Sequence, residues 1–243
     1  MLFSNIFHDE VPLSKGACVA FLGGGGKSSL VFKLGKELSL HFDKVLLTSV
    51  TKAGPEKSVP LHLIDSNENV DLESKFKAQN PLYLLQKKIR TDKYQGFTVN
   101  QLKTFHQYAD ITLVEADGSR NLPLKAHTDY DPVVPVFSTH VIILIGADAI
   151  NTRIQDGKVH RPELFCEKWK LTPEEILTPD IIAKVVTHPL GYLSKIPAPV
   201  QIVYFINKVS SNNDESRALA AAIKDRSSHS VFYGSVRESW WKE

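Results

Sequence analysis

Four consecutive glycines followed by Lys27 and Ser28 are the residues whose types and spacing most clearly indicate chemistry in this chain. Glycine lets backbone N–H groups converge on an anion without interference from a Cβ atom. The N-terminus of a helix that follows adds partial positive charge. A lysine at this position neutralises terminal phosphate oxygens, and the next hydroxyl ligates Mg²⁺. The pattern predicts a phosphate-binding loop formed by Gly23, Gly24, Gly25, Gly26, Lys27, Ser28 and Ser29.

This loop is shorter than the common Walker pattern. In G-x-x-x-x-G-K-[ST] the first glycine would fall on Phe21, so the chain retains only Gly23-x-x-Gly26-Lys27-Ser28. Mur-type peptide ligases use a loop of that length, so the shortening is compatible with nucleotide binding. A flexible glycine turn is the simpler alternative. The apolar segment before the loop and the helical pattern after it favour the phosphate site.

A second group of candidate residues ends an apolar run that begins at Ile111. Glu115 and Asp117 follow this run directly, and a carboxylate at a strand tip can hold Mg²⁺ beside a phosphate loop, directly or through water. Because side chains alternate along a strand, the two carboxylates would lie on the same side, and either could be the ligand. An ordinary Asp-Gly turn is the alternative. The metal site is predicted from Ser28, Glu115 and Asp117, and the catalytic set from Lys27, Glu115 and Asp117.

Other polar residues follow predicted strands, at the edge where α/β sheets bind ligands. Thr51 and Lys52 could face phosphates or Mg²⁺. Arg120 and Lys125 lie close in sequence to the two carboxylates, so they are candidates for phosphate or substrate contacts, with solvated surface charges as an equal alternative. Arg161 could reach a phosphate, although a position in the helix-capping segment is an equally simple interpretation of this residue.

The segment Asn207-Lys208-Val209-Ser210 ends a strongly apolar strand. Many GTP-binding proteins place Asn-Lys-x-Asp here, and the aspartate pairs with guanine. Ser210 occupies the aspartate position, which removes the main basis for guanine preference. Asn207 and Lys208 are still expected to border a base pocket. The predicted cofactors are therefore ATP, or another nucleoside triphosphate, and Mg²⁺.

Hydrophobic periodicity supplies the elements that would position these residues. A helix is expected from Ser28 to about His41, and the buried strand Val45–Thr48 after it completes a βαβ unit. Further strands are expected at 111–115, 141–145, 200–206 and 231–233, and an inserted hairpin at 61–64 and 82–85. Other helices are expected at 98–108, 160–169 and 214–225, with helix starts at Thr172 and Thr178 and a hairpin turn at 156–157.

These elements predict an α/β fold, a three-layer αβα P-loop NTPase-like domain with a mostly parallel sheet. The chain of 243 residues suits a single domain over residues 1–243, with a small helical subregion at about 160–195.

Composition narrows the class of partner. Hydrophobic residues make up 42% and charged residues 23%, as in ordinary globular proteins. The net charge of +2 gives no electrostatic reason to expect nucleic acid or a membrane surface as partner. Cys18 and Cys166 are far apart and are expected to be reduced thiols. With neither a basic signal region nor a long apolar run, the sequence predicts a cytoplasmic protein.

The chain resembles the YqeC family, accessory proteins of selenium-dependent molybdenum hydroxylases. The resemblance depends on segments that span most of the chain in family order, 21–30, 45–52, 114–125, 160–163 and 207–209, of which the block from Glu115 to Lys125 is the most specific. The family pattern usually has Thr-Thr where this chain has Ser28-Ser29, and a run of threonines where it has Ser49-Val50. The resemblance implies a nucleotide-binding protein that assists maturation of a selenium-containing cofactor, with such a hydroxylase or another maturation protein as partner.

Two classes of function follow. The first is a Mg²⁺-dependent NTPase or ATP-dependent transferase or ligase, with phosphate passing to water or to an acceptor. The second is a non-catalytic chaperone or scaffold that binds nucleotide or a molybdopterin-type cofactor and delivers it. A dinucleotide-dependent oxidoreductase fits poorly, because G-x-G-x-x-G would need glycine at Ser28 and no acid ends the second strand.

Overall fold

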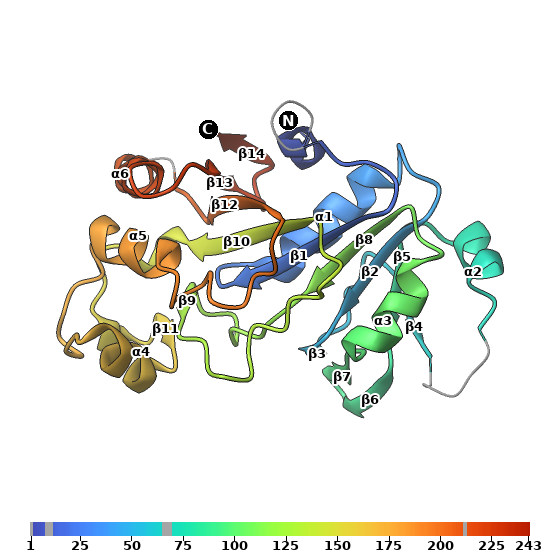
Figure 1. Cartoon of the computed structure of the whole chain (residues 1–243), viewed down its shortest axis with the longest axis horizontal. Coiled ribbons are helices and arrows are strands. Elements are labelled where there is room, and N and C mark those ends of the chain that lie inside the picture. The colour runs from blue at the N-terminus through green and yellow to red at the C-terminus, as the bar shows by residue number, and fades with distance from the viewer. Residues whose placement is uncertain (1, 8–11, 65–69, 211–212) are drawn as a thin grey trace.

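The computed structural model describes residues 2–7, 12–64, 70–210 and 213–243. Within these residues the central element is a nine-stranded sheet of order β14-β13-β12-β10-β1-β8-β2-β5-β4 (Figure 1), in which only the β13–β14 pair is antiparallel. The strands are β1 (Ala17–Gly23), β2 (Val45–Ser49), β4 (Leu61–Leu63), β5 (Leu82–Leu85), β8 (Ile111–Glu115), β10 (His140–Gly146), β12 (Gln201–Asn207), β13 (Ser230–Ser235) and β14 (Trp240–Lys242). The predicted α/β fold with a mostly parallel sheet is confirmed.

Helices cover both faces of this sheet and make three layers. The α1 helix (Lys27–Leu38) and the 3₁₀-helix η1 (Phe3–Phe7) share one buried cluster with Val19 and Phe21 of β1. Cys18, Ala20 and Leu22, which alternate with them, belong to the cluster on the opposite face. That face is covered by helices α2 (Leu72–Ala78), α3 (Val99–His106), α4 (Pro162–Trp169), α5 (Pro179–Thr187) and α6 (Asp214–Lys224).

The continuous apolar character of the central strands follows from this arrangement, because a parallel sheet is buried on both faces. Every residue of β1 and β10 is buried. Cys18 is one of them, and burial raises the pKa of its thiol to about 12, although a hydrogen bond from Ser138 opposes this. It is therefore a core thiol, as predicted.

Short elements surround the carboxyl ends of the strands. A small sheet of order β3-β7-β6 and a parallel pair β11–β9 lie at this edge, below the main sheet in Figure 1. Their bounds are β3 (Lys52–Ala53), β6 (Lys87–Arg90), β7 (Lys93–Gln95), β9 (Leu124–Lys125) and β11 (Val159–His160). Two further 3₁₀-helices are η2 (Ala147–Ala149) and η3 (Ile154–Asp156).

The predicted hairpin of residues 61–64 and 82–85 is wrong. β4 and β5 pair in parallel, with Leu61 opposite Tyr83, at the edge of the main sheet. A parallel pair needs a crossover connection, and α2 provides it by burying Leu72 and Phe76 against the core.

Two smaller predictions are also wrong. Residues 156–157 do not form a β-hairpin turn, because Gly157 with φ +74° ends η3. Thr172 does not start a helix, because residues 175–177 bond to the 151–154 segment instead, for example from Leu177 N to Thr152 O at 2.8 Å. The start at Thr178 is confirmed, since its hydroxyl accepts a hydrogen bond from Ile181 N.

The single domain and its helical subregion stay predictions. Phe165 of α4 and Ile182 of α5 lie in the same buried cluster as Cys18 of the central strand. None of the helices in the described ranges has the length and apolar character that a membrane span requires.

Candidate functional site

The glycine loop lies between the ends of two strands that flank β1. β1 pairs with β8 on one side and with β10 on the other. From β1 the chain continues to β2 on the β8 side, and from β8 it crosses to β10, so β1 lies at a topological switch point. In open α/β sheets ligands bind at this position, outside the carboxyl ends of the strands.

Close packing explains the run of glycines. Gly23, Gly25 and Gly26 have φ values of +97°, +86° and +114°, a region that side chains rarely adopt. A Cβ atom on Gly24 would lie 2.4 Å from Leu122 O, and one on Gly25 would lie 2.4 Å from Gly146 N. The loop is therefore held against the segment after β8 and the end of β10.

Three of the glycine amides are already bonded within the protein. Gly23 N donates to Oδ2 of Asp117 at 3.0 Å, Gly24 N to Leu144 O at 2.9 Å, and Gly25 N to Leu122 O at 3.0 Å. These three amides therefore have acceptors within the protein, which the prediction of a phosphate-binding loop from residues 23–29 did not anticipate. The amides at the start of α1, residues 26–29, are those that a helix leaves without an intrahelical acceptor.

Asn207, predicted to border a base pocket, holds the glycine loop from the end of β12. Its Nδ2 donates to Gly25 O at 2.8 Å, and its Oδ1 accepts from Val236 N at 2.9 Å. The side chain is buried. Both polar atoms of its amide are therefore engaged in fixing the loop.

Lys27 forms the first turn of α1 and lies almost completely buried. Its ammonium donates to Gly23 O at 2.5 Å and to Ser119 Oγ at 3.4 Å, and lies 3.1 Å from Oδ1 of Asp117. The loop lysine therefore forms a direct ion pair with the carboxylate that follows β8.

Asp117 is the centre of a buried charge cluster. Its Oδ2 accepts from Nε2 of His127 at 2.7 Å and lies 3.2 Å from Nζ of Lys125. Burial alone would raise the pKa of this carboxyl, but Lys27, the His127 hydrogen bond and Lys125 hold it well below its usual range. Asp117 is consequently an ionised group that fixes its neighbours.

Lys125 belongs to this cluster and does not contact the cavity. It is fully buried, donates to Gly118 O at 2.7 Å, and also pairs with Asp117 and Asp131. The expectation that Lys125 contacts phosphate or substrate is wrong here, because its ammonium is already surrounded by protein oxygens. Its backbone is held by the Tyr192 hydroxyl, which accepts from Lys125 N and donates to Lys125 O.

Of the three predicted metal ligands, Glu115 and Ser28 have side-chain oxygens with fewer protein contacts than those of Asp117. Burial raises the pKa of the Glu115 carboxyl, while Lys27 and a hydrogen bond from Ser28 oppose this shift. Ser28 is exposed at the start of α1. Carboxylate and hydroxyl oxygens are the donor types that Mg²⁺ accepts, so Ser28 and Glu115 fit this ion. Asp117 fits less well, because its oxygens already bind Gly23, Lys27, Lys125 and His127.

Most predicted site residues meet at one cavity of about 1660 Å³. From the predicted set, it is lined by Gly26, Lys27, Ser28, Ser29, Thr51, Lys52, Glu115, Asp117, Arg120, Arg161 and Lys208. Arg161 also donates through Nη1 to both carboxylate oxygens of Asp131 at 3.0 Å. Gly23, Gly24 and Lys125 lie behind this lining.

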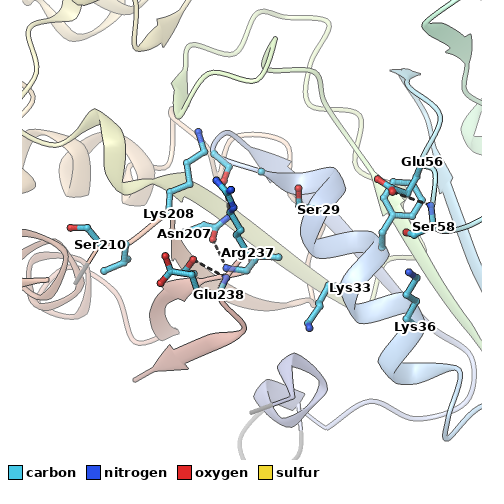
Figure 2. Close-up of a pocket in the computed structure, with 16 residues that line it drawn as sticks. Ser29, Lys33, Lys36, Glu56, Ser58, Asn207, Lys208, Ser210, Arg237 and Glu238 are labelled. Carbon is cyan, nitrogen blue, oxygen red and sulfur yellow. Dashed lines mark hydrogen bonds between the residues drawn. The ribbon is translucent and has the colours of Figure 1, made fainter. Parts of the chain in front are cut away.

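A second cavity of about 960 Å³ lies along the neighbouring side of α1 (Figure 2). Figure 2 shows that its walls come from α1, from the end of β12 at Asn207 and Lys208, and from the segment after β13 at Arg237 and Glu238. The two cavities share Gly26, Ser29, Phe32, Glu56 and Lys208. They therefore meet at the start of α1.

His127 and Asp131 were missed by sequence reasoning. With Asp117 they offer ligand atoms within 4.8 Å of one another, a spacing that could hold a metal ion. The Lys125 ammonium already pairs with both carboxylates, so a protein cation occupies this cluster. The spacing of Lys125 and His127, two residues apart after the acidic strand end, is the one sequence signal that could have indicated them.

Together, fold and site define a three-layer αβα protein whose glycine loop lies at the carboxyl edge of a mostly parallel sheet, beside an acidic strand end. The family model described as YqeC protein matches residues 19–163, and the chain belongs to the YqeC family. An uncharacterized protein YqeC from Escherichia coli (strain K12) is 28% identical over 227 residues, which cover 90% of this chain and 88% of that relative.

Proposed function

We propose that this protein binds a nucleoside triphosphate, ATP in preference to GTP, with Mg²⁺, and acts as an NTPase or ATP-dependent transferase or ligase. The observation that carries the proposal is that the α1 N-terminus, Lys27, Ser28 and Glu115 line the larger cavity next to its junction with the smaller one at Gly26 and Ser29. A helix N-terminus and a lysine attract phosphate, while the carboxylate and hydroxyl fit Mg²⁺.

Each residue has a defined part in this proposal. The amides of residues 26–29 bind phosphate oxygens, and the Lys27 ammonium exchanges its contact with Gly23 O for a phosphate oxygen. Asp117 stays ionised and keeps Lys27 and the loop in register. Mg²⁺, held by Ser28 and Glu115, would neutralise charge on the phosphates. Catalysis of this kind consists mainly of positioning and charge stabilisation.

The nucleoside is assigned to the cavity in Figure 2, which adjoins the loop and has apolar walls at Phe32, Val209 and Val236. Ser210 also lines it. A hydroxyl there does not offer the carboxylate that selects guanine in GTP-binding proteins, which supports ATP over GTP.

The cellular role follows from the family resemblance. We propose that the protein assists maturation of a selenium-containing molybdenum hydroxylase, with that enzyme or another maturation protein as partner. Cys18 and Cys166 are free thiols, which supports a cytoplasmic location as part of the proposal. Delivery of a bound nucleotide or molybdopterin-type cofactor without turnover is the alternative, and phosphate release in the presence of the hydroxylase distinguishes the two.

Calorimetric titration with Mg²⁺ and a non-hydrolysable ATP analogue tests nucleotide binding. Lys27→Met should weaken binding by about 100-fold or more, since it removes a charge-assisted contact to phosphate. Lys103→Met, at an exposed site on α3, is the matched control and should bind like the unchanged protein. Thermal unfolding without ligand must show that Lys27→Met is folded. Equal affinity of a folded Lys27→Met variant and the unchanged protein would refute the proposal.

A further inference from the structure

The larger cavity is lined by seven lysine and arginine side chains and by six carboxylates, those of Glu56, Asp92, Glu115, Asp117, Asp131 and Glu163. Besides Lys27, its basic lining residues are Lys52, Arg90, Lys93, Arg120, Arg161 and Lys208. They come from separate segments, including β3, the β6–β7 hairpin, the loop after β8, and the start of α4. The cavity is thus bordered by cations from several sides of the carboxyl edge.

Some of these cations are neutralised within the protein. Arg90 pairs with Asp92 at 2.7 Å, Arg161 with Asp131 at 3.0 Å, and Lys208 with Asp148 at 3.1 Å. In contrast, no ion pair is formed by Lys52, Lys93 or Arg120 with any carboxylate in the described parts of the chain. Their charge is available to a ligand.

His160 lines the same cavity and is affected by the neighbouring cations. Partial burial lowers the pKa of its imidazole to about 4, and the positive charges of Arg161, Lys125 and Arg120 contribute, while Asp131 opposes them. Burial and these cations together disfavour a protonated imidazole at this point of the lining.

Backbone strain is concentrated at this lining. Arg120, Asn121, Arg161 and Lys208 have φ values of 51°, 64°, 63° and 62°, and all of them border the cavity. Positive φ in non-glycine residues costs free energy, and such residues cluster at functional sites. The strained loop at 120–121 presents Arg120 directly after the acidic strand end.

We propose that Lys52, Lys93 and Arg120 bind a second substrate, a small molecule with a phosphate or similar oxyanion group, alongside the nucleotide. This inference rests on the proposed function and deepens it, because a separate anion site beside the triphosphate is the arrangement of a transferase or ligase. The cavity of about 1660 Å³ adjoins the nucleotide site through Gly26 and Ser29. It therefore has room for an acceptor next to the terminal phosphate.

Titration of inorganic phosphate into the protein saturated with Mg²⁺ and a non-hydrolysable ATP analogue tests this site. One phosphate should bind per chain. Arg120→Gln and Lys52→Gln should each weaken phosphate binding by about tenfold or more, since each removes a charge-assisted contact. Their affinity for the nucleotide analogue should change less than about twofold, which also shows that they are folded. Lys88→Gln, exposed on β6 and outside the cavity lining, is the matched control.

The outcomes separate this inference from the proposed function. If both glutamine variants bind phosphate as the unchanged protein does, or if saturating nucleotide prevents phosphate binding, the second anion site does not exist and nucleotide binding is unaffected. If the analogue does not bind, the proposed function fails. In that case, the same phosphate titration without nucleotide tests the anion site alone. The site is supported if Arg120→Gln loses phosphate binding and Lys27→Met retains it. It is refuted if Lys27→Met loses phosphate binding and Arg120→Gln retains it.

Discussion

The ammonium of Lys27 lies 3.1 Å from Oδ1 of Asp117, and both side chains are buried. This contact joins the first turn of α1 to the segment that follows β8. Removing two charges from water has a large cost that further hydrogen bonds must offset. Gly23 N and His127 supply such bonds to Asp117. The pair is thus part of a connected buried cluster that holds the glycine loop.

Replacement of Asp117 should show how strongly this cluster supports the fold. Asp117→Asn leaves Lys27 and Lys125 without their shared carboxylate, and we expect a loss of about 3–5 kcal/mol in the free energy of unfolding. Urea denaturation measures it. Asp92→Asn, in the exposed pair with Arg90, should cost less than about 1 kcal/mol. Similar losses in the two variants would mean that the Asp117 cluster contributes little.

Acid should destabilise the protein through the same cluster. The pKa values of Asp117 and Asp131 are held below the ordinary 3.8, for Asp131 by hydrogen bonds from Lys125 and Thr128 that outweigh the effect of burial. A carboxyl with a lowered pKa in the folded state stabilises the protein above its unfolded pKa, and this is lost as pH falls through the folded value. Stability should therefore decrease below about pH 4.

The Asp131→Asn variant isolates one part of that decrease. Urea denaturation at a series of pH values should show a shallower fall below about pH 4 in this variant than in the unchanged protein, because it lacks one titrating group. Asp180→Asn, in an exposed pair with Arg226, serves as control and should keep the original slope. Parallel curves for all three proteins would exclude Asp131 as a contributor.

The glycine loop should be intolerant of side chains where it contacts backbone. Gly25→Ala places a Cβ atom 2.4 Å from Gly146 N at a residue with φ +86°, so we expect the loop to shift, with a loss of about 1–3 kcal/mol in unfolding free energy. Gly118→Ala meets nothing within 4 Å and should be nearly neutral. Thermal denaturation compares them, and an unaffected Gly25→Ala variant would contradict the packing described for the loop.

The structure also distinguishes the two carboxylates proposed for magnesium. Glu115→Gln should raise the Mg²⁺ concentration needed for half-maximal nucleotide binding by about tenfold or more, because it removes an anionic ligand. Burial raises the pKa of Glu115, so the Mg²⁺ requirement should also increase as pH falls and the carboxylate is protonated. Calorimetry over Mg²⁺ concentration and pH measures both effects. A Mg²⁺ dependence unchanged in Glu115→Gln would assign the ion elsewhere.

Local patterns were sufficient to predict the central part of the fold. The apolar run before Gly23, the amphipathic spacing after Lys27, and the strand that ends at Glu115 all correspond to observed elements. A helix was likewise expected to begin at Thr98, whose hydroxyl caps α3 by accepting a hydrogen bond from Gln101 N. Such features depend on neighbours a few residues apart, so a single sequence contains them.

Long-range features were not predictable in the same way. The parallel pairing of β4 with β5 depends on a crossover rather than on local periodicity. Lysine is rarely buried without a partner, so a position in the interior was not expected for Lys125. Its supports, Asp131 and Tyr192, and the bond from Asn207 to Gly25 across 182 positions, become visible only when the chain is folded.

The bond between Asn207 and Gly25 has a consequence for biosynthesis. The glycine loop is encoded near the beginning of the chain, but the amide that holds it comes from β12 and is itself held by Val236 N. During translation, the loop therefore lacks this support until Asn207 and Val236 have left the ribosome. A nascent chain that already carries every glycine and Lys27 acquires the finished binding loop only after about 200 further residues have been added.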